Sequence, residues 1–138
     1  MVNRFVYKPD NQDIYLFLGL LFTIYLTIRA IVIPITIDEA GTYYNYMPRS
    51  VADILLFNGD PSPNNHILNT LSMKLFTALF GTTTFVVRLP NLMGFLLFYT
   101  AAVRLFTLMF KTRILVIAAL LVLLCNPYLL DFFAVARG

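Results

Sequence analysis

Three long stretches of the chain are almost free of charged residues, and they limit its possible folds more than any other feature. They are residues 14–36, 89–110 and 114–136. A transmembrane helix needs about 20 mainly apolar residues to cross a hydrocarbon layer of about 30 Å. The first stretch would extend over roughly 34 Å as an α-helix. The sequence therefore predicts an all-α integral membrane protein with three transmembrane helices.

The composition excludes a water-soluble domain for most of the chain. Of the 138 residues, 59% are apolar and 12% are charged, whereas soluble domains average about 45–50% and about 25%. A chain this apolar is not expected to be disordered. Its one cysteine cannot form a disulfide framework. The length allows a single domain over residues 1–138.

The basic residues indicate the direction in which the predicted helices cross. The net charge is +3, but lysine and arginine form no compact cluster, so we expect no nucleic-acid partner. Arg104, Lys111 and Arg113 form the densest basic region, which the positive-inside bias places in the cytoplasm. Basic residues also precede the first span, so the N-terminus should be cytoplasmic. Residues 37–88 are then expected to be an external loop.

Short helices that lie along the membrane are predicted in this external loop. The spacing Thr36-x-x-Glu39 is typical of a capping box, so a helix should begin at Ile37 and end before Pro48. Ser50 should cap a second helix, which the dipeptide 58–59 (Asn-Gly) would end.

Residues 66–80 decide how many times the chain crosses. Polar residues recur there at helical spacing: His66, Asn69, Thr70, Lys74 and Thr77. Leucines fill the opposite side, which favours an interfacial amphipathic helix. The alternative is a short fourth span, but it would place the Lys111–Arg113 turn outside, against the charge bias.

Asp38 and Glu39 are the main candidates for catalysis. These two adjacent acids come directly after the first predicted span. A carboxylate that is partly shielded from water has a raised pKa and can act as a base towards a hydroxyl or an amine. The structural alternative is that acids in a first helical turn complement the helix dipole, and that Glu39 only caps.

Five other residues are weaker candidates, and four of them have a structural alternative. His66, the only histidine, is a possible hydrogen-bond donor, proton shuttle or metal ligand, or an ordinary interface residue; Asn65 precedes it as a further candidate for substrate binding. Lys74 and Arg137 are candidates for binding a phosphate, or they anchor the protein at the membrane surface. Tyr43 could line a sugar site or belong to an aromatic belt.

Four features occur in one order along the chain and together resemble a known superfamily. They are Ile37-Asp38-Glu39-Ala40, the segment 64–69, Leu79-Phe80-Gly81 with Val87-Arg88-Leu89-Pro90, and Ala136-Arg137-Gly138. This set is similar to the N-terminal part of polyprenyl-phosphate-dependent glycosyltransferases of the GT-C superfamily. That superfamily includes protein O-mannosyltransferases and the lipid A aminoarabinose transferase.

The resemblance implies a fold, a reaction and roles for particular residues. It implies a GT-C-like module that moves a sugar from a polyprenyl-phosphate donor to a protein, lipid A or another glycan. Asp38 matches the catalytic base or acceptor-orienting acid, and Glu39 matches the second acid of that pair. Arg137 falls near an arginine associated with the donor phosphate. His66 falls where mannosyltransferases have His-Pro-Pro, although Ile and Leu follow it here.

The resemblance also implies a location and a larger protein. The expected location is the bacterial inner membrane, with the active site facing outside. No metal-ligating residue is assigned, although a divalent metal ion stays open as a cofactor. The chain would be the first part of a longer enzyme and inactive by itself. The alternative function is a non-catalytic membrane subunit or scaffold; a transporter is disfavoured because no inverted repeat is visible.

Overall fold

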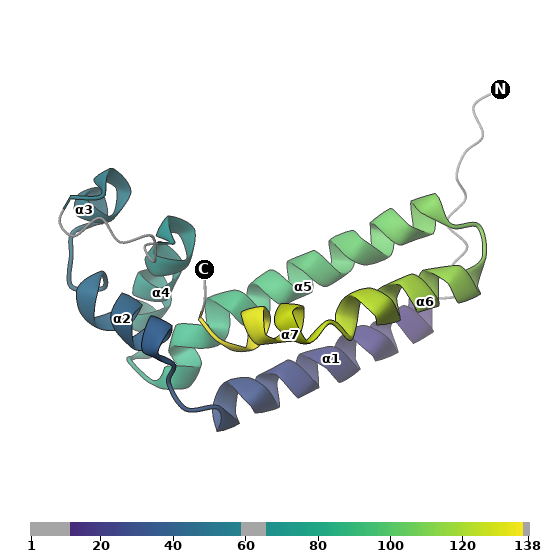
Figure 1. Cartoon of the computed structure of the whole chain (residues 1–138), viewed down its shortest axis with the longest axis horizontal. Helices are drawn as coiled ribbons and strands as arrows, with labels where there is room; N and C mark the ends of the chain where they lie inside the picture. Colours follow the sequence, from purple (N-terminus) through teal and green to yellow (C-terminus); the bar gives the residue numbers. More distant parts are fainter. Residues whose placement is uncertain (1–11, 59–65, 137–138) are drawn as a thin grey trace.

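The computed structural model describes residues 12–58 and 66–136, and all regular structure in these residues is α-helical. The elements are α1 (Gln12–Val32), α2 (Ile37–Asn45), α3 (Val51–Leu56), α4 (Ile67–Phe80), α5 (Thr84–Met109), α6 (Arg113–Leu124) and α7 (Pro127–Ala134). Figure 1 shows α1, α5 and the α6–α7 pair running along one another as a rod, with α2, α3 and α4 gathered at one end. The predicted all-α class is confirmed for the described residues.

Two helices, α1 and α5, are long and apolar enough to cross a membrane. They correspond to the first two predicted spans, although α5 begins five residues before the predicted start at residue 89 and carries Pro90 inside it. Helices α6 and α7 reach the required length and hydropathy only when taken together. The chain therefore has two candidate membrane spans, or three if the bent pair counts as one.

The prediction of one continuous helix over residues 114–136 is wrong. The chain bends by 65° between α6 and α7. Asn126 caps α7, with its side chain accepting a hydrogen bond from the Tyr128 N–H, and Pro127 is the first helical residue. Proline lacks an N–H and disfavours helical backbone at the residue before it, so the first helix cannot continue through this point.

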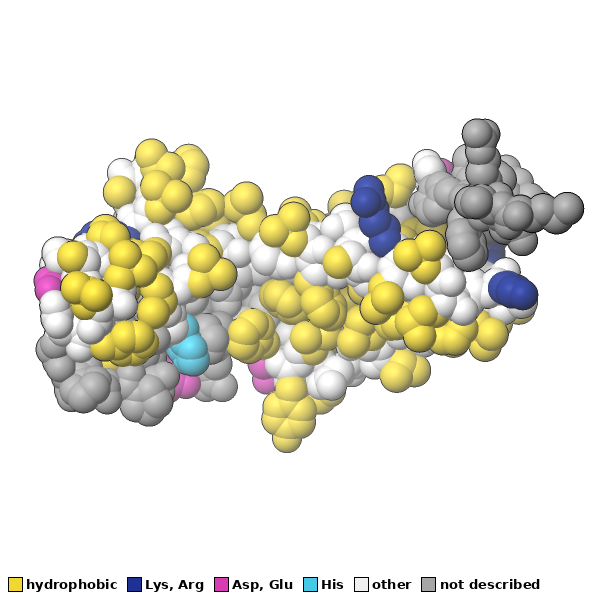
Figure 2. Space-filling view, turned by 90° about the horizontal axis from the view of Figure 1, so that it is seen from above, with side chains coloured by type: hydrophobic (Ala, Val, Ile, Leu, Met, Phe, Trp, Pro, Cys, Tyr) yellow, Lys and Arg dark blue, Asp and Glu magenta, His cyan; other side chains and the backbone are white. Residues whose placement is uncertain are grey.

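A hydrophobic core lies between α5 and its neighbours. Its buried members include Leu26 and Ala30 of α1, Phe95 and Tyr99 of α5, Leu120 and Leu124 of α6, and Phe133 of α7. The Phe95 ring contacts both Tyr99 and Phe133, with centroid separations of 6.0 and 5.5 Å. Large apolar side chains also cover much of the outside of the rod, as Figure 2 shows in yellow. An apolar exterior of this extent is compatible with lipid and not with water.

Substituting Gly19 with alanine is expected to destabilise the packing of α1 on α5 by about 1–3 kcal/mol. A Cβ at position 19 would lie 2.5 Å from Cε1 of Tyr99, and that ring is held by its hydroxyl, which donates to the Tyr15 carbonyl. Thermal unfolding in detergent measures the loss. Gly41→Ala is the control, because a Cβ there meets nothing within 4 Å and alanine favours a helix. Equal melting temperatures for Gly19→Ala and the unmodified protein would contradict this packing.

The predicted starts of α2 and α3 are confirmed. Thr36 and Glu39 form the expected capping box, and the Ser50 hydroxyl accepts from the Asp53 N–H. Helix α2 ends at Asn45, before Pro48 as predicted. Helix α3 ends at Leu56, and its C-cap Phe57 adopts a left-handed conformation with φ 53°, just before the expected stop at residues 58–59.

Helix α4 packs with its polar side towards the protein. Thr70 and Thr77 are buried, whereas Leu68, Leu75 and Leu79 are exposed. Most of the predicted polar stripe therefore contacts α5 and the loop after α2, and the leucines face outward. This arrangement suits a helix whose outer side meets lipid. Its position at the membrane interface stays a prediction.

Candidate functional site

Glu39 and Arg88 form a fully buried ion pair at the end of the rod. Each side chain is 0% exposed. Arg88 Nε–H donates to Glu39 Oε1 at 2.7 Å, and Nη2–H donates to Oε2 at 2.6 Å. The backbone N–H groups of Ala136 and Thr36 also donate to the carboxylate, at 2.7 and 2.8 Å. A carboxylate has about four acceptor positions, so the hydrogen-bonding capacity of Glu39 is used within the protein.

The other donors of Arg88 bind the end of α1. Its Nη1 donates to the carbonyls of Ala30 and Ile33 at 2.9 and 2.7 Å, and its Nη2 donates to the Pro34 carbonyl at 2.9 Å. The last carbonyls of a helix have no intrahelical partner and carry partial negative charge. A guanidinium therefore stabilises this end twice, through hydrogen bonds and through charge. Arg88 joins α1, α2 and α5 at one point.

Acid is expected to remove a stabilising contribution of Glu39. Burial by itself raises the pKa of this carboxylate, but the hydrogen bonds that it accepts, first of all from Arg88, outweigh burial and hold the pKa below 4.5. A carboxylate whose pKa is lower in the folded state than in the unfolded state stabilises the fold at pH values above its ordinary pKa. This contribution is lost as the pH falls through the folded-state pKa. Melting temperatures measured from pH 7 to pH 3 should therefore fall steeply below about pH 4.5.

The control for this pH dependence is Glu39→Gln, which cannot titrate. The variant is less stable at pH 7, but its melting temperature should fall less on acidification. The comparison also subtracts the contribution of Asp53, whose pKa is lowered by its hydrogen bonds to Ser50 and Asn58. The same acid-induced loss in both proteins would contradict the role given to Glu39.

Asp38 lies beside this ion pair but is exposed. Both acids belong to the first turn of α2, where successive side chains point about 100° apart around the axis. Because Glu39 is anchored inside, Asp38 is directed outward at the end of the rod. The ion pair thus fixes the backbone that carries the second acid.

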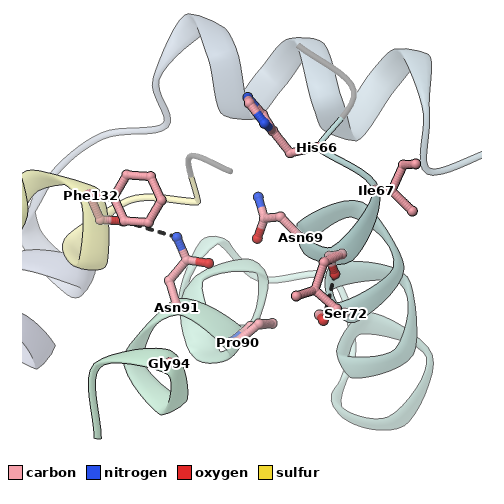
Figure 3. Close-up of a pocket in the computed structure, with 9 residues that line it drawn as sticks. His66, Ile67, Asn69, Ser72, Pro90, Asn91, Gly94 and Phe132 are labelled. Atoms are coloured by element: carbon pink, nitrogen blue, oxygen red, sulfur yellow. Dashed lines mark hydrogen bonds between the residues drawn. The ribbon is translucent and has the colours of Figure 1, made fainter. Parts of the chain in front are cut away.

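A cleft of about 470 Å³ opens between α4, α5 and α7. Its polar lining consists of His66, Asn69, Ser72 and Asn91, and its apolar lining includes Leu68, Pro90 and Phe132. Figure 3 shows the side chains of His66, Asn69 and Asn91 around one space, with the Phe132 ring at its side. His66 is exposed and makes no cap hydrogen bond to α4. The cleft combines amide, hydroxyl and imidazole groups with an apolar wall.

Two asparagines and Glu39 hold the backbone that follows α7. Asn91 Nδ2 donates to the carbonyls of Phe132 and Val135 at 3.1 and 2.6 Å. Asn69 Nδ2 donates to the Ala136 carbonyl at 3.2 Å, while the Ala136 N–H binds Glu39. Side chains from α2, α4 and α5 therefore fix the last described residues, directly before the predicted phosphate-binding Arg137.

The structure uses two other predicted site residues for packing. Lys74 Nζ donates to the carbonyls of Met47 and Arg49, both at 2.8 Å, and so ties α4 to the loop after α2. Tyr43 packs partly buried against the cluster of Met73, Val87 and Ala136 and does not line the cleft. A phosphate-binding role for Lys74 and a sugar-binding role for Tyr43 stay predictions. Asn65 and Arg137 lie outside the described residues.

Sequence reasoning missed three residues that organise this end of the molecule: Arg88, Asn69 and Asn91. An arginine next to an apolar span and close to a proline is a signal, because a charge there must find a partner. The ion pair between Arg29 and Asp131, with N···O 2.5 Å, was also not predicted. It links α1 to α7. Within residues 12–58 and 66–136, no group of three or more His, Cys, Asp or Glu side chains is arranged to hold a metal ion.

No protein-family model, curated protein or solved structure matches this chain. The resemblance to GT-C glycosyltransferases therefore stays a prediction, carried by the sequence motifs alone. What the structure adds is geometry: an exposed Asp38 on a backbone anchored by a buried ion pair, and a cleft lined by uncharged polar groups.

Proposed function

We propose that this chain is the N-terminal part of a membrane glycosyltransferase that moves a sugar from a polyprenyl-phosphate donor to an acceptor. The observation that carries the proposal is the pairing of two adjacent acids with opposite surroundings. Glu39 is fully buried and bound by Arg88, whereas Asp38 is exposed at the end of a membrane-length helix bundle. Asp38 is exposed to water, contrary to the partial shielding expected from the sequence, but the buried Glu39 fixes the backbone that carries it. Positioning of this kind supports a role in orienting the acceptor and accepting its proton.

In the proposed reaction, Asp38 orients the acceptor hydroxyl or amine and accepts its proton. The acceptor atom forms a bond to the anomeric carbon as the bond from that carbon to the phosphate oxygen breaks. The electron pair of that bond leaves with the polyprenyl phosphate, whose charge a cation must neutralise. Arg137 is the sequence candidate for this cation. Glu39 and Arg88 act as positioning residues, because both side chains are fully buried.

The proposed orientation places this reaction on the outer face of the bacterial inner membrane. The basic turn of Lys111 and Arg113 lies at the opposite end of α5 from Arg88. With that turn in the cytoplasm, the buried ion pair, Asp38 and the cleft lie towards the outside. A lipid-linked donor would then approach from the outer leaflet.

The test is an assay of the complete gene product. The purified protein in lipid nanodiscs is incubated with radiolabelled polyprenyl-phosphate sugars and a membrane extract that supplies acceptors. Transfer of the label to protein or glycolipid is expected. Equal amounts of label in protein and glycolipid with and without the protein would overturn the proposal and would favour the non-catalytic subunit. Parallel reactions with EDTA determine whether a divalent metal ion takes part.

A further inference from the structure

We infer that the cleft between α4, α5 and α7 binds the neutral sugar ring of a lipid-linked saccharide and excludes its phosphate. This inference rests on the proposed function for the choice of a sugar, and it names which group of the donor lies where. The cleft volume of about 470 Å³ falls within the range of about 300–1,000 Å³ that is usual for small-molecule sites.

The polar lining of the cleft suits hydroxyl groups. Asn69 and Ser72 present an amide and a hydroxyl, groups that can both donate and accept hydrogen bonds, as sugar hydroxyls do. The Ser72 hydroxyl donates to the Leu68 carbonyl at 2.7 Å, so its oxygen remains suited to accept a hydrogen bond from a ligand.

Asn69 supplies the strongest indication of a ligand. Its Nδ2 is used by the Ala136 carbonyl, which defines the orientation of the amide. Its Oδ1 is buried and has no hydrogen-bond partner in the structure. A buried acceptor without a partner costs about 1–3 kcal/mol. The last side-chain torsion of asparagine has a broad energy well, so a small rotation would turn this oxygen towards a ligand hydroxyl in the cleft.

The scarcity of charged side chains around the cleft argues against a phosphate inside it. Among the described residues that line the cleft there is no lysine, arginine, aspartate or glutamate, and His66 is the only titratable one. The phosphodiester of such a donor is an anion that needs cationic donors, and without them its desolvation is unfavourable. A neutral ring has no such requirement.

The apolar side of the cleft favours a sugar that is attached to lipid. Phe132 and Pro90 offer a wall for the C–H groups of a ring. Leu68, which also lines the cleft, is 81% exposed on the outer side of α4. A ligand that enters beside Leu68 passes over an apolar surface, and an attached lipid chain can remain there in the bilayer.

The test uses a fluorescent reporter in the cleft and requires no catalysis. The protein contains no tryptophan, so Phe132→Trp introduces a single one and preserves an aromatic wall. This variant, in phosphatidylcholine nanodiscs, is titrated with three probes: monoglucosyl diacylglycerol, free glucose and decyl phosphate. We expect a saturable change of emission with the glycolipid, and none with decyl phosphate or with millimolar glucose.

Two further substitutions, made in the reporter variant, locate the binding site. Asn69→Leu should weaken glycolipid binding about tenfold, the effect of losing about 1.4 kcal/mol. Asn45→Leu, the same change at an exposed position of α2 outside the cleft, should leave binding unchanged. Gly94→Leu fills the cleft without removing a side-chain hydrogen bond and should abolish binding. Because only Asn69→Leu removes a hydrogen bond to the backbone, Gly94→Leu separates loss of the site from loss of stability.

Several results would overturn the inference. They are no saturable response to the glycolipid, equal binding by Gly94→Leu, or saturation by decyl phosphate at lower concentration. Saturation by glucose as readily as by the glycolipid would overturn the lipid attachment. The proposed function fails separately: sugar transfer without saturable binding in this cleft contradicts only the inference, and saturable binding without transfer contradicts only the proposed function.

Discussion

Replacing Arg88 with methionine is expected to destabilise the protein by about 3–5 kcal/mol, the cost of leaving a buried charge without its partner. The substitution leaves the Glu39 carboxylate buried with two backbone donors and no cation. It also removes the donors that bind the end of α1. A loss of this size is a large part of the stability of a small domain. The variant should therefore unfold at much lower temperature or denaturant concentration.

The measurement is unfolding in detergent, followed by circular dichroism, with two comparisons. Arg104→Met changes an exposed arginine on the same helix and should alter stability by less than about 0.5 kcal/mol. The double variant Glu39→Leu/Arg88→Met removes both charges and should be more stable than Arg88→Met alone. If Arg88→Met and Arg104→Met unfold alike, the ion pair does not hold this end of the rod together.

Replacing Asp38 with asparagine is expected to lower sugar transfer by the complete gene product about 10²- to 10⁴-fold, the usual contribution of general base catalysis. The two side chains have nearly the same shape, but an amide does not accept the acceptor's proton. Because Asp38 is exposed and Glu39 anchors the helix, the fold should be unaffected. The rate is measured with a radiolabelled polyprenyl-phosphate sugar, and stability by the melting temperature.

Asp13→Asn is the matched control for this substitution. Asp13 is also an exposed acid in a first helical turn, at the start of α1, and its replacement should leave transfer unchanged. Transfer at the unmodified rate by Asp38→Asn would show that Asp38 is not the base. A rate loss together with a lower melting temperature would instead assign Asp38 to the fold.

Local signals in the sequence located most of the helices. Apolar runs of sufficient length predicted α1 and α5, and the caps at Thr36 and Ser50 predicted the starts of α2 and α3. Such signals act within a few residues and therefore survive in any tertiary context. The Asn126-Pro127 dipeptide is an equally local signal of a helix break, but the prediction of the third span did not take it into account.

The orientation of α4 and the composition of the cleft were not accessible in this way. A stripe of polar residues indicates that a helix has two different sides, but not which medium each side meets. In a membrane protein the polar side can face the interior while leucines face lipid, and α4 has this arrangement. The cleft needs three helices, of which α7 was itself expected to continue α6.

The amino-acid sequence determined that this chain forms apolar helices long enough to cross a membrane and that Asp38 and Glu39 follow the first of them, because hydropathy and caps depend on near neighbours. Only the tertiary structure decided which of the two acids is buried. Glu39 meets Arg88 across 49 positions of sequence, a pairing that depends on how α1, α2 and α5 pack. That packing gives two similar carboxylates different surroundings: Glu39 is a buried structural anchor, and Asp38 is exposed.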